Sequence, residues 1–218
     1  MHKEAKEYVL DVISEFKLSS LPALEIGSLD VNGSIREAFT GIFIGIDRVA
    51  GKGVDIVAEA ADFDTDARFG VVISMEALEH TPRPADIIEC AARVLKPGGR
   101  FIITCAAPPR RPHGCDGRRP PPEGEHYRNI TPDELRKLLS GWANVSILYN
   151  RRRGDLYAHA MKEALKAPPP PPAFVEVESV RAWEQPKENH ADSDHDDRRS
   201  ARSVQALRTM DEPTDPPA

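Results

Sequence analysis

The segment spanning residues 23–33 constrains the fold more than any other part of this chain. An apolar run at residues 23–26, which includes Glu25, is followed by Gly27 and a little later by Gly33. This order predicts a short buried strand that carries an acid, a turn opened by glycine, and then the start of a helix. One such unit is a weak signal, because many nucleotide-binding folds begin this way.

Two further predicted strands also run into acids. Residues 42–46 precede Asp47, and residues 54–60 lead to Asp62. In open parallel sheets, ligands bind beyond the carboxyl ends of the strands, where these acids are expected. Carboxylates at three successive strand ends suit a ligand with a ribose, an amino group and a positive charge, and suit a pyrophosphate much less.

Helices and strands alternate through the rest of the first 166 residues. One helical face near the amino terminus carries Tyr8, Val9, Val12, Ile13 and Phe16. Buried strands are predicted at residues 69–74 and 100–107. A helix is predicted between them at residues 85–95, and the Lys-Pro-Gly-Gly sequence at residues 96–99 ends it. The alternation predicts a doubly wound α/β domain with a mostly parallel sheet.

The last predicted elements lie between residues 131 and 161. Thr131 and Glu134 form a capping box, with Pro132 at the first helical position. Two strands at residues 145–149 and 156–161 then close the sheet. The irregular residues 108–129 are too long for an ordinary connection and are expected at the ligand end of the sheet, so they are predicted to form a lid on the substrate side.

Size and composition narrow the class of protein. The chain of 218 residues predicts one domain at residues 1–166 and a tail at residues 167–218. Its net charge of -6 argues against a general nucleic-acid binder. No apolar run approaches the roughly 20 residues that span a bilayer, and the charged start lacks the apolar core of a signal peptide. The odd number of cysteines, 3, favours a reducing compartment, and we expect a cytoplasmic protein.

The tail differs in character from the domain. Five consecutive prolines at residues 168–172 predict a stiff spacer. Residues 184–218 are rich in charge and proline, which predicts disorder. Proline runs also dock in aromatic grooves, so a protein partner for the tail stays open.

On these elements, residues 20–162 resemble the class I S-adenosylmethionine-dependent methyltransferases of the small Rossmann-like type. Five segments in order carry the resemblance. They are Leu24-Glu25-Ile26-Gly27, Gly45-Ile46-Asp47, Ala60-Ala61-Asp62-Phe63, Ser74-Met75-Glu76-Ala77-Leu78-Glu79-His80 and Leu95-Lys96-Pro97-Gly98-Gly99-Arg100-Phe101. The resemblance implies a seven-stranded sheet whose last strand is antiparallel, S-adenosylmethionine as the cofactor and S-adenosylhomocysteine as the product.

The resemblance also assigns roles to the acids. Glu25 would bind the amino group of the cofactor, Asp47 would accept hydrogen bonds from both ribose hydroxyls, and Asp62 would accept from the adenine amino group beside Phe63. At Gly27 the missing side chain lets the backbone approach the methionine portion. The other residues assigned to the cofactor site are Ser28, Arg48, Ser74, Met75 and Glu76.

The sulfonium carbon of such a cofactor is already electrophilic, so catalysis is mostly alignment of the acceptor. A base is needed only if the acceptor must lose a proton. His80 is the candidate base, although a histidine that satisfies the backbone is an equally good interpretation, and Tyr127 is a candidate on the substrate side. The spacing of His113, Cys115 and His126 matches no recognised zinc pattern, so no metal is expected. The preferred acceptor is a small molecule, a sugar or a lipid precursor.

Other interpretations are weighed against this one. Leu29 stands where a second glycine of a glycine-rich dinucleotide-binding turn would be, which argues against a nicotinamide-dependent oxidoreductase. The same departure leaves open a catalytically degenerate protein that serves in binding or as a scaffold. Arginines at residues 110–111, 118–119 and 151–153 suggest a local basic patch. The signature of amino-group DNA methyltransferases is missing after residue 74, so a nucleic-acid acceptor is disfavoured.

Overall fold

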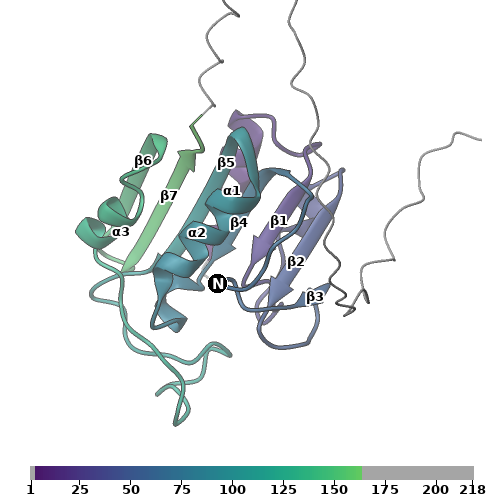
Figure 1. Ribbon diagram of the computed structural model, residues 1–218. Helices are drawn as coiled ribbons and strands as arrows, with labels where there is room; N and C mark the ends of the chain where they lie inside the picture. Colours follow the sequence, from purple (N-terminus) through teal and green to yellow (C-terminus); the bar gives the residue numbers. More distant parts are fainter. Residues whose placement is uncertain (1–2, 164–218) are drawn as a thin grey trace, which may run out of the picture. The chain divides into compact units, whose positions relative to one another are not determined.

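A computed structural model describes residues 3–163, and the tail predicted at residues 167–218 lies outside the described residues. Seven strands form one sheet in the order β3-β2-β1-β4-β5-β7-β6 (Figure 1). The strands are β1 Ala23–Ile26, β2 Phe43–Asp47, β3 Ile56–Val57, β4 Phe69–Met75, β5 Leu95–Ala106, β6 Ala143–Asn150 and β7 Asp155–Met161. Strands β1 to β5 pair in parallel, whereas β7 is antiparallel to both β5 and β6. The predicted sheet with its antiparallel last strand is confirmed.

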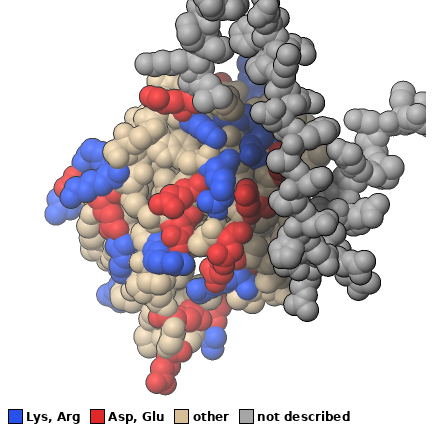
Figure 2. All heavy atoms as spheres, in the orientation of Figure 1, with Lys and Arg blue, Asp and Glu red and all other residues tan. Residues whose placement is uncertain are grey.

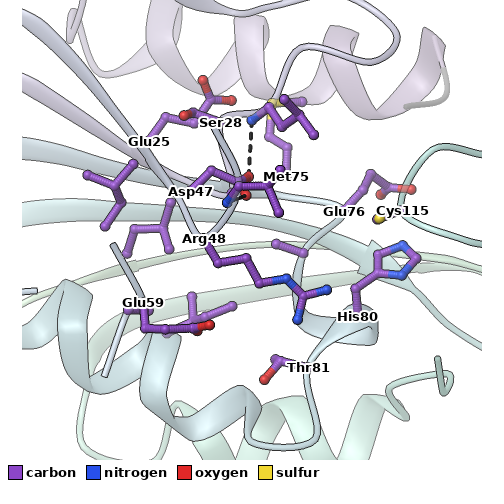
Figure 3. A pocket seen from close by; sticks show the side chains of 18 of the residues that line it. Glu25, Ser28, Asp47, Arg48, Glu59, Met75, Glu76, His80, Thr81 and Cys115 are labelled. Atoms are coloured by element: carbon purple, nitrogen blue, oxygen red, sulfur yellow. Dashed lines mark hydrogen bonds between the residues drawn. The ribbon is translucent and has the colours of Figure 1, made fainter. Parts of the chain in front are cut away.

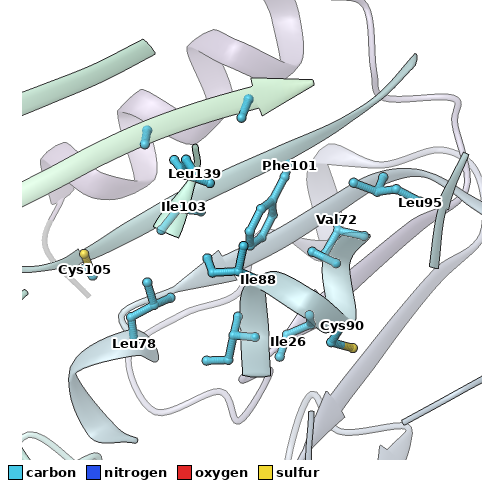
Figure 4. Close-up of a cluster of buried hydrophobic side chains, with 14 of the residues drawn as sticks. Ile26, Val72, Leu78, Ile88, Cys90, Leu95, Phe101, Ile103, Cys105 and Leu139 are labelled. Atoms are coloured by element: carbon cyan, nitrogen blue, oxygen red, sulfur yellow. The ribbon is translucent and has the colours of Figure 1, made fainter. Parts of the chain in front are cut away.

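Helices cover both faces of this sheet. The alternation of side chains along each strand divides the core into two clusters. On one face, α1 (Lys3–Glu15) packs with Ala23, Val71 and Ile73. On the other, α2 (Pro84–Val94) and α3 (Pro132–Leu138) pack with Leu24, Val72 and Phe101 (Figure 4). The doubly wound arrangement is therefore confirmed, and it leaves the carboxyl ends of the parallel strands open for a ligand.

The capping box of α3 forms as the sequence predicts. The Oγ1 atom of Thr131 accepts a hydrogen bond from the backbone N–H of Glu134 at 3.2 Å, and Pro132 begins the helix. The Glu134 carboxylate pairs with Arg128, the last basic residue of the long irregular segment. The start of α3 thus also holds the end of that segment.

The prediction of a helix after Gly33 is wrong. Only one 3-10 turn, η1 (Arg36–Ala38), stands between β1 and β2. The segment has to bury Ile35 and Phe39 on the α1 face, and Arg36 donates to the carbonyls of Phe43 and Gly53 at 3.0 and 3.1 Å. These tertiary contacts hold the connection close to β2, where a longer helix would pull it away.

Two other predicted boundaries differ from the structure. Strand β5 begins at Leu95 instead of residue 100, because Leu95 pairs with Phe69 and the ladder resumes only at Arg100 after an irregularity. The third predicted strand shrinks to Ile56–Val57 at the exposed edge of the sheet. Within residues 3–163, no helix is both long enough and apolar enough to cross a membrane.

Candidate cofactor and acceptor site

A cavity lies at the carboxyl ends of β1, β2 and β4 (Figure 3). Its wall includes Glu25 from β1, Asp47 from β2, and Glu76 and His80 from the segment after β4. Because these strands are parallel neighbours, their carboxyl ends meet at one edge of the sheet. Acidic groups from three strands therefore surround one space.

Asp47 is held in place by the backbone around it. Its Oδ2 accepts from the N–H of Leu29 at 3.1 Å, and its Oδ1 accepts from the N–H of Val49 at 3.0 Å. A carboxylate has roughly four acceptor sites, so each oxygen keeps one for a ligand donor. The residue both caps the adjoining turns and presents a fixed acceptor at the end of β2.

Glu25 lies within β1, and its side chain is buried beside the cavity. Burial, opposed by Arg36 and assisted by Asp30 and Asp47, raises the pKa of its carboxyl to about 7. The free energy of a carboxylate here would fall if a positively charged ligand group came close to it. This position therefore favours a cationic ligand group.

The turn after β1 is shaped by Gly27. Its φ of +83° is in the left-handed region, and a Cβ there would lie 2.7 Å from the Cβ of Ala77. Next to it, the buried Oγ of Ser28 has no hydrogen-bond partner among the described residues. The turn thus brings backbone and one hydroxyl close to the cavity without filling it.

Glu76 follows β4 with a φ of +55°, which is strained for a residue with a side chain. Its Oε2 pairs with the Nη2 of Arg110 at 2.8 Å, while its buried Oε1 has no partner among residues 3–163. Arg110 also pairs with Asp155, which accepts from the hydroxyl of Tyr157 at 2.9 Å. This network ties the start of the long segment after β5 to Glu76 in the cavity wall and to the start of β7.

At the other end of the cavity, aromatic rings gather around His80. The centroid of its ring lies 5.2 Å from that of His113 and 5.5 Å from that of Tyr127. Burial lowers the pKa of His80 to about 4, and it lowers the pKa of His113 as well. Both imidazoles are therefore neutral at pH 7 and each has a nitrogen lone pair.

The family described as "Methyltransferase domain" matches residues 45–103 of the chain. The ubiquinone biosynthesis O-methyltransferase of Leptothrix cholodnii is 44% identical over 50 residues, which are 23% of this chain and 21% of that protein. The protein of the same name from Paracidovorax citrulli is 42% identical over 83 residues, 38% of this chain and 26% of its own. The matches thus span between a fifth and about a quarter of these relatives.

Solved structures extend the likeness to the whole sheet. The crystal structure of the 1,6-didemethyltoxoflavin-N1-methyltransferase of Burkholderia thailandensis, with S-adenosylhomocysteine bound, superposes with a TM-score of 0.55 at 16% identity. It covers 73% of this chain and 78% of that one. The magnesium protoporphyrin IX methyltransferase of Synechocystis gives a TM-score of 0.52 at 15% identity, over 74% and 84% of the two chains. At these identities the likeness concerns the fold. This chain resembles the class I methyltransferases in sequence and in fold.

Within this methyltransferase fold, most residues that the sequence singles out surround the cavity. They are Glu25, Gly27, Ser28, Asp47, Arg48, Met75, Glu76 and His80. Tyr127 is not in the wall, but its ring packs on those of His80 and His113. The long segment predicted as a lid does contribute Cys115 to the wall.

Three residues that the sequence assigns to the cofactor lie elsewhere. Asp62 is exposed, Phe63 is buried in the core of the α2 face, and Ser74 is wholly buried within β4. A turn at residues 59–63 explains the first two, because the N–H of Phe63 donates to the carbonyl of Glu59 and so turns its ring inward. The backbone N–H of Asp62 bonds to the same carbonyl, and its side chain is left in solvent.

The sequence gives little sign of several residues near the cavity. Arg93 on α2 donates to the carbonyls of Ala60 and Phe63 and so fixes the turn at residues 59–63. Glu59 lines the cavity where Asp62 was expected. Arg110, suggested as part of a basic patch, is buried in ion pairs instead, and Figure 2 shows basic and acidic side chains interspersed on the face that it displays.

Proposed function

We propose that this chain transfers a methyl group from S-adenosylmethionine to a small-molecule acceptor, with an oxygen as the receiving atom. The observation that carries the proposal is the cavity at the ends of β1, β2 and β4, walled by Glu25, Asp47 and Glu76. The oxygen acceptor is suggested by the names of the relatives in Leptothrix and Paracidovorax, which are O-methyltransferases.

The residues present fit this cofactor. The buried carboxylate of Glu25 suits its ammonium group, and Asp47 has acceptor sites to spare for two ribose hydroxyls. Two buried atoms without partners among the described residues, Ser28 Oγ and Glu76 Oε1, belong to the same wall and would gain polar contacts. When bound, the cofactor supplies a methyl group on a positively charged sulfur.

The chain's own part in the reaction is then to bind and to align. We assign cofactor binding to Glu25, Gly27, Ser28, Asp47, Arg48, Met75 and Glu76. We assign the acceptor side to His80 and to Tyr127, whose ring packs on it. Because the reaction is an in-line displacement, holding the acceptor at the correct angle is the main source of acceleration.

Calorimetric titration of the full chain with S-adenosylmethionine and S-adenosylhomocysteine tests the proposal, with NADH as the control. Micromolar binding of the first two and none of NADH is expected. Absence of binding to both would overturn the proposal and would favour the alternative of a catalytically degenerate methyltransferase fold. Binding of NADH alone would point to an oxidoreductase instead.

A further inference from the structure

Three side chains with metal-binding atoms gather beside the acceptor end of the cavity. Glu79 and His80 come from the 3-10 turn η2 (Leu78–His80) after β4, and His113 comes from the long segment after β5. One ligand atom from each lies within 4.8 Å of the other two. His80 also lines the cavity, so the cluster stands directly next to the proposed acceptor.

Two of these groups are already oriented by the backbone. The Oε1 of Glu79 accepts from the N–H of Ala106 at 3.0 Å. The Nδ1 of His113 lies 3.2 Å from the carbonyl oxygen of Arg111, and since a carbonyl only accepts, Nδ1 carries the proton. The lone pair of His113 is therefore on Nε2. Metal-binding carboxylates and histidines are commonly held in this way by a second hydrogen bond.

Two further polar atoms of the cluster are without partners. Among the residues that the structure describes, the buried atoms Glu79 Oε2 and His80 Nδ1 make no hydrogen bond. Glu79 is wholly buried, so its carboxyl cannot turn to solvent instead. Leaving such atoms unsatisfied costs free energy, which a bound cation would offset at both atoms.

The charges of the surrounding buried groups also leave room for a cation. Glu76, Glu79 and Asp155 supply three carboxyl groups, all of them almost or wholly buried. Arg110 supplies one guanidinium, and it is engaged by Glu76 and Asp155. A divalent ion bound to an ionised Glu79 would balance the two negative charges that this group of four then carries.

We propose that Glu79, His80 and His113 bind a divalent ion of the first transition row, such as Mn²⁺, Co²⁺ or Zn²⁺. Two imidazoles and one carboxylate are a donor set for these ions, whereas Mg²⁺ and Ca²⁺ prefer oxygen ligands alone. Three protein ligands leave coordination positions open. Spacing along the chain relates His113 only to its sequence neighbours, whereas the fold brings it to His80.

The ion gives the proposed acceptor a chemical class, and this step rests on the proposed function. A hydroxyl bound at an open position loses its proton to solvent more readily than a free one. Its oxygen then forms a bond to the methyl carbon while the bond from that carbon to sulfur breaks, and the electron pair of that bond stays on sulfur. The acceptor is thus expected to be an oxygen compound that can chelate a metal.

Cobalt binding to the full chain, freed of metal with a chelator, tests the site without cofactor or acceptor. One Co²⁺ per chain with visible absorption bands is expected, displaced by Zn²⁺. In Glu79→Gln and His113→Gln, affinity is expected to fall at least tenfold, while His159→Gln, whose histidine lies on β7 outside the cluster, keeps it. Circular dichroism checks that each variant is folded.

The possible outcomes separate the two proposals. No Co²⁺ binding by the folded chain, or binding that survives both cluster variants, would overturn the metal site whatever the cofactor titration gives. Acetohydroxamate, a simple oxygen chelator, should shift the cobalt bands if positions are open, and unchanged bands would overturn the claim of an oxygen acceptor on the ion. A failed titration with S-adenosylmethionine beside intact Co²⁺ binding would overturn the proposed function alone.

Discussion

The guanidinium of Arg110 bridges two carboxylates that belong to different parts of the sheet. Its Nη2 lies 2.8 Å from the Oε2 of Glu76, the residue after β4, and its Nη1 pairs with Asp155 at the start of β7. All three side chains are nearly or wholly buried. The long segment after β5, in which Arg110 lies, is therefore anchored at its base to the end of β4 and to the start of β7.

Replacing Arg110 by alanine should destabilise the domain strongly. The change leaves two buried carboxylates without their shared partner, which typically costs about 3–5 kcal/mol. Urea denaturation of Arg110→Ala and of the wild type measures the difference in the free energy of unfolding. Arg118→Ala is the matched control, because its ion pair with Asp116 is largely exposed and should contribute at most about 0.5 kcal/mol. Equal small losses in the two variants would refute the anchoring role.

Glu25 should make the stability of the domain depend on pH. Burial, with Asp30 and Asp47 nearby, outweighs Arg36 and raises the pKa of Glu25 from 4.5 to about 7. The unfolded chain releases this proton at lower pH than the folded one, so stability falls as pH rises through this window. Glu25→Gln removes the effect. The free energy of unfolding of this variant, taken relative to the wild type, should therefore rise by about 2–3 kcal/mol from pH 4.5 to pH 8. Urea denaturation at the two pH values tests this, and a constant difference would contradict it.

The same carboxyl should couple cofactor binding to protons. An ammonium group near Glu25 favours its ionised form, so binding displaces the proton that the empty site holds below pH 7. The affinity of the wild type for S-adenosylmethionine should therefore rise from pH 6 to pH 7.5. In Glu25→Gln the affinity should be weaker and nearly flat over this range. Titration calorimetry in two buffers of different ionisation enthalpy measures the released proton, and no release would contradict the contact.

Regular patterns in the sequence were sufficient to predict most of the fold. Helix α1 is amphipathic, Thr131 and Glu134 cap α3, and the runs that form β4 and residues 101–106 of β5 are mostly apolar, so local and tertiary preferences agree there. After Gly33 they disagree. The contacts of Arg36 with two distant carbonyls favour a 3-10 turn, and no local pattern encodes such contacts.

The candidate site shows the same division. The position of Glu25 and Asp47 beside the cavity could be predicted because each lies at or near the end of a predicted strand. Asp62 lies outside the cavity wall because a turn fixed by Arg93 from α2 leaves it exposed, and sequence spacing does not show this turn. The meeting of His113 with Glu79 depends on the path of a segment without helix or strand, so only the three-dimensional structure could reveal it.

Asp47 and Asp62 offer a direct test of which acid serves the cofactor. Asp47 lines the cavity, whereas Asp62 is exposed outside its wall. Asp47→Ala should weaken S-adenosylmethionine binding by about 1.5–3 kcal/mol, the range for hydrogen bonds to a charged group. Asp62→Ala should leave the affinity unchanged. Calorimetric titration of both folded variants decides between them, and a larger loss in Asp62→Ala would mean that the turn at residues 59–63 rearranges when the cofactor binds.

Gly27 and Gly98 separate two consequences of adding a side chain. Both have positive φ, +83° and +77°, so alanine at either position should lose about 1–2 kcal/mol to backbone strain. At Gly27 the new Cβ would lie 2.7 Å from the Cβ of Ala77, while at Gly98 no atom of residues 3–163 beyond its chain neighbours lies within 4 Å. Gly27→Ala should therefore lose about 1–3 kcal/mol more than Gly98→Ala, the usual cost of overpacking.

The same pair of variants reports on the cavity. The clash at Gly27 pushes the turn after β1 away from Ala77, and both residues line the cavity. Gly27→Ala is therefore expected to weaken S-adenosylmethionine binding at least tenfold, while Gly98→Ala, which lies outside the wall, binds like the wild type. Urea denaturation and calorimetry on both variants measure the two effects. If Gly27→Ala lost stability but kept its full affinity, the turn would serve packing against Ala77 and would have no part in holding the cofactor.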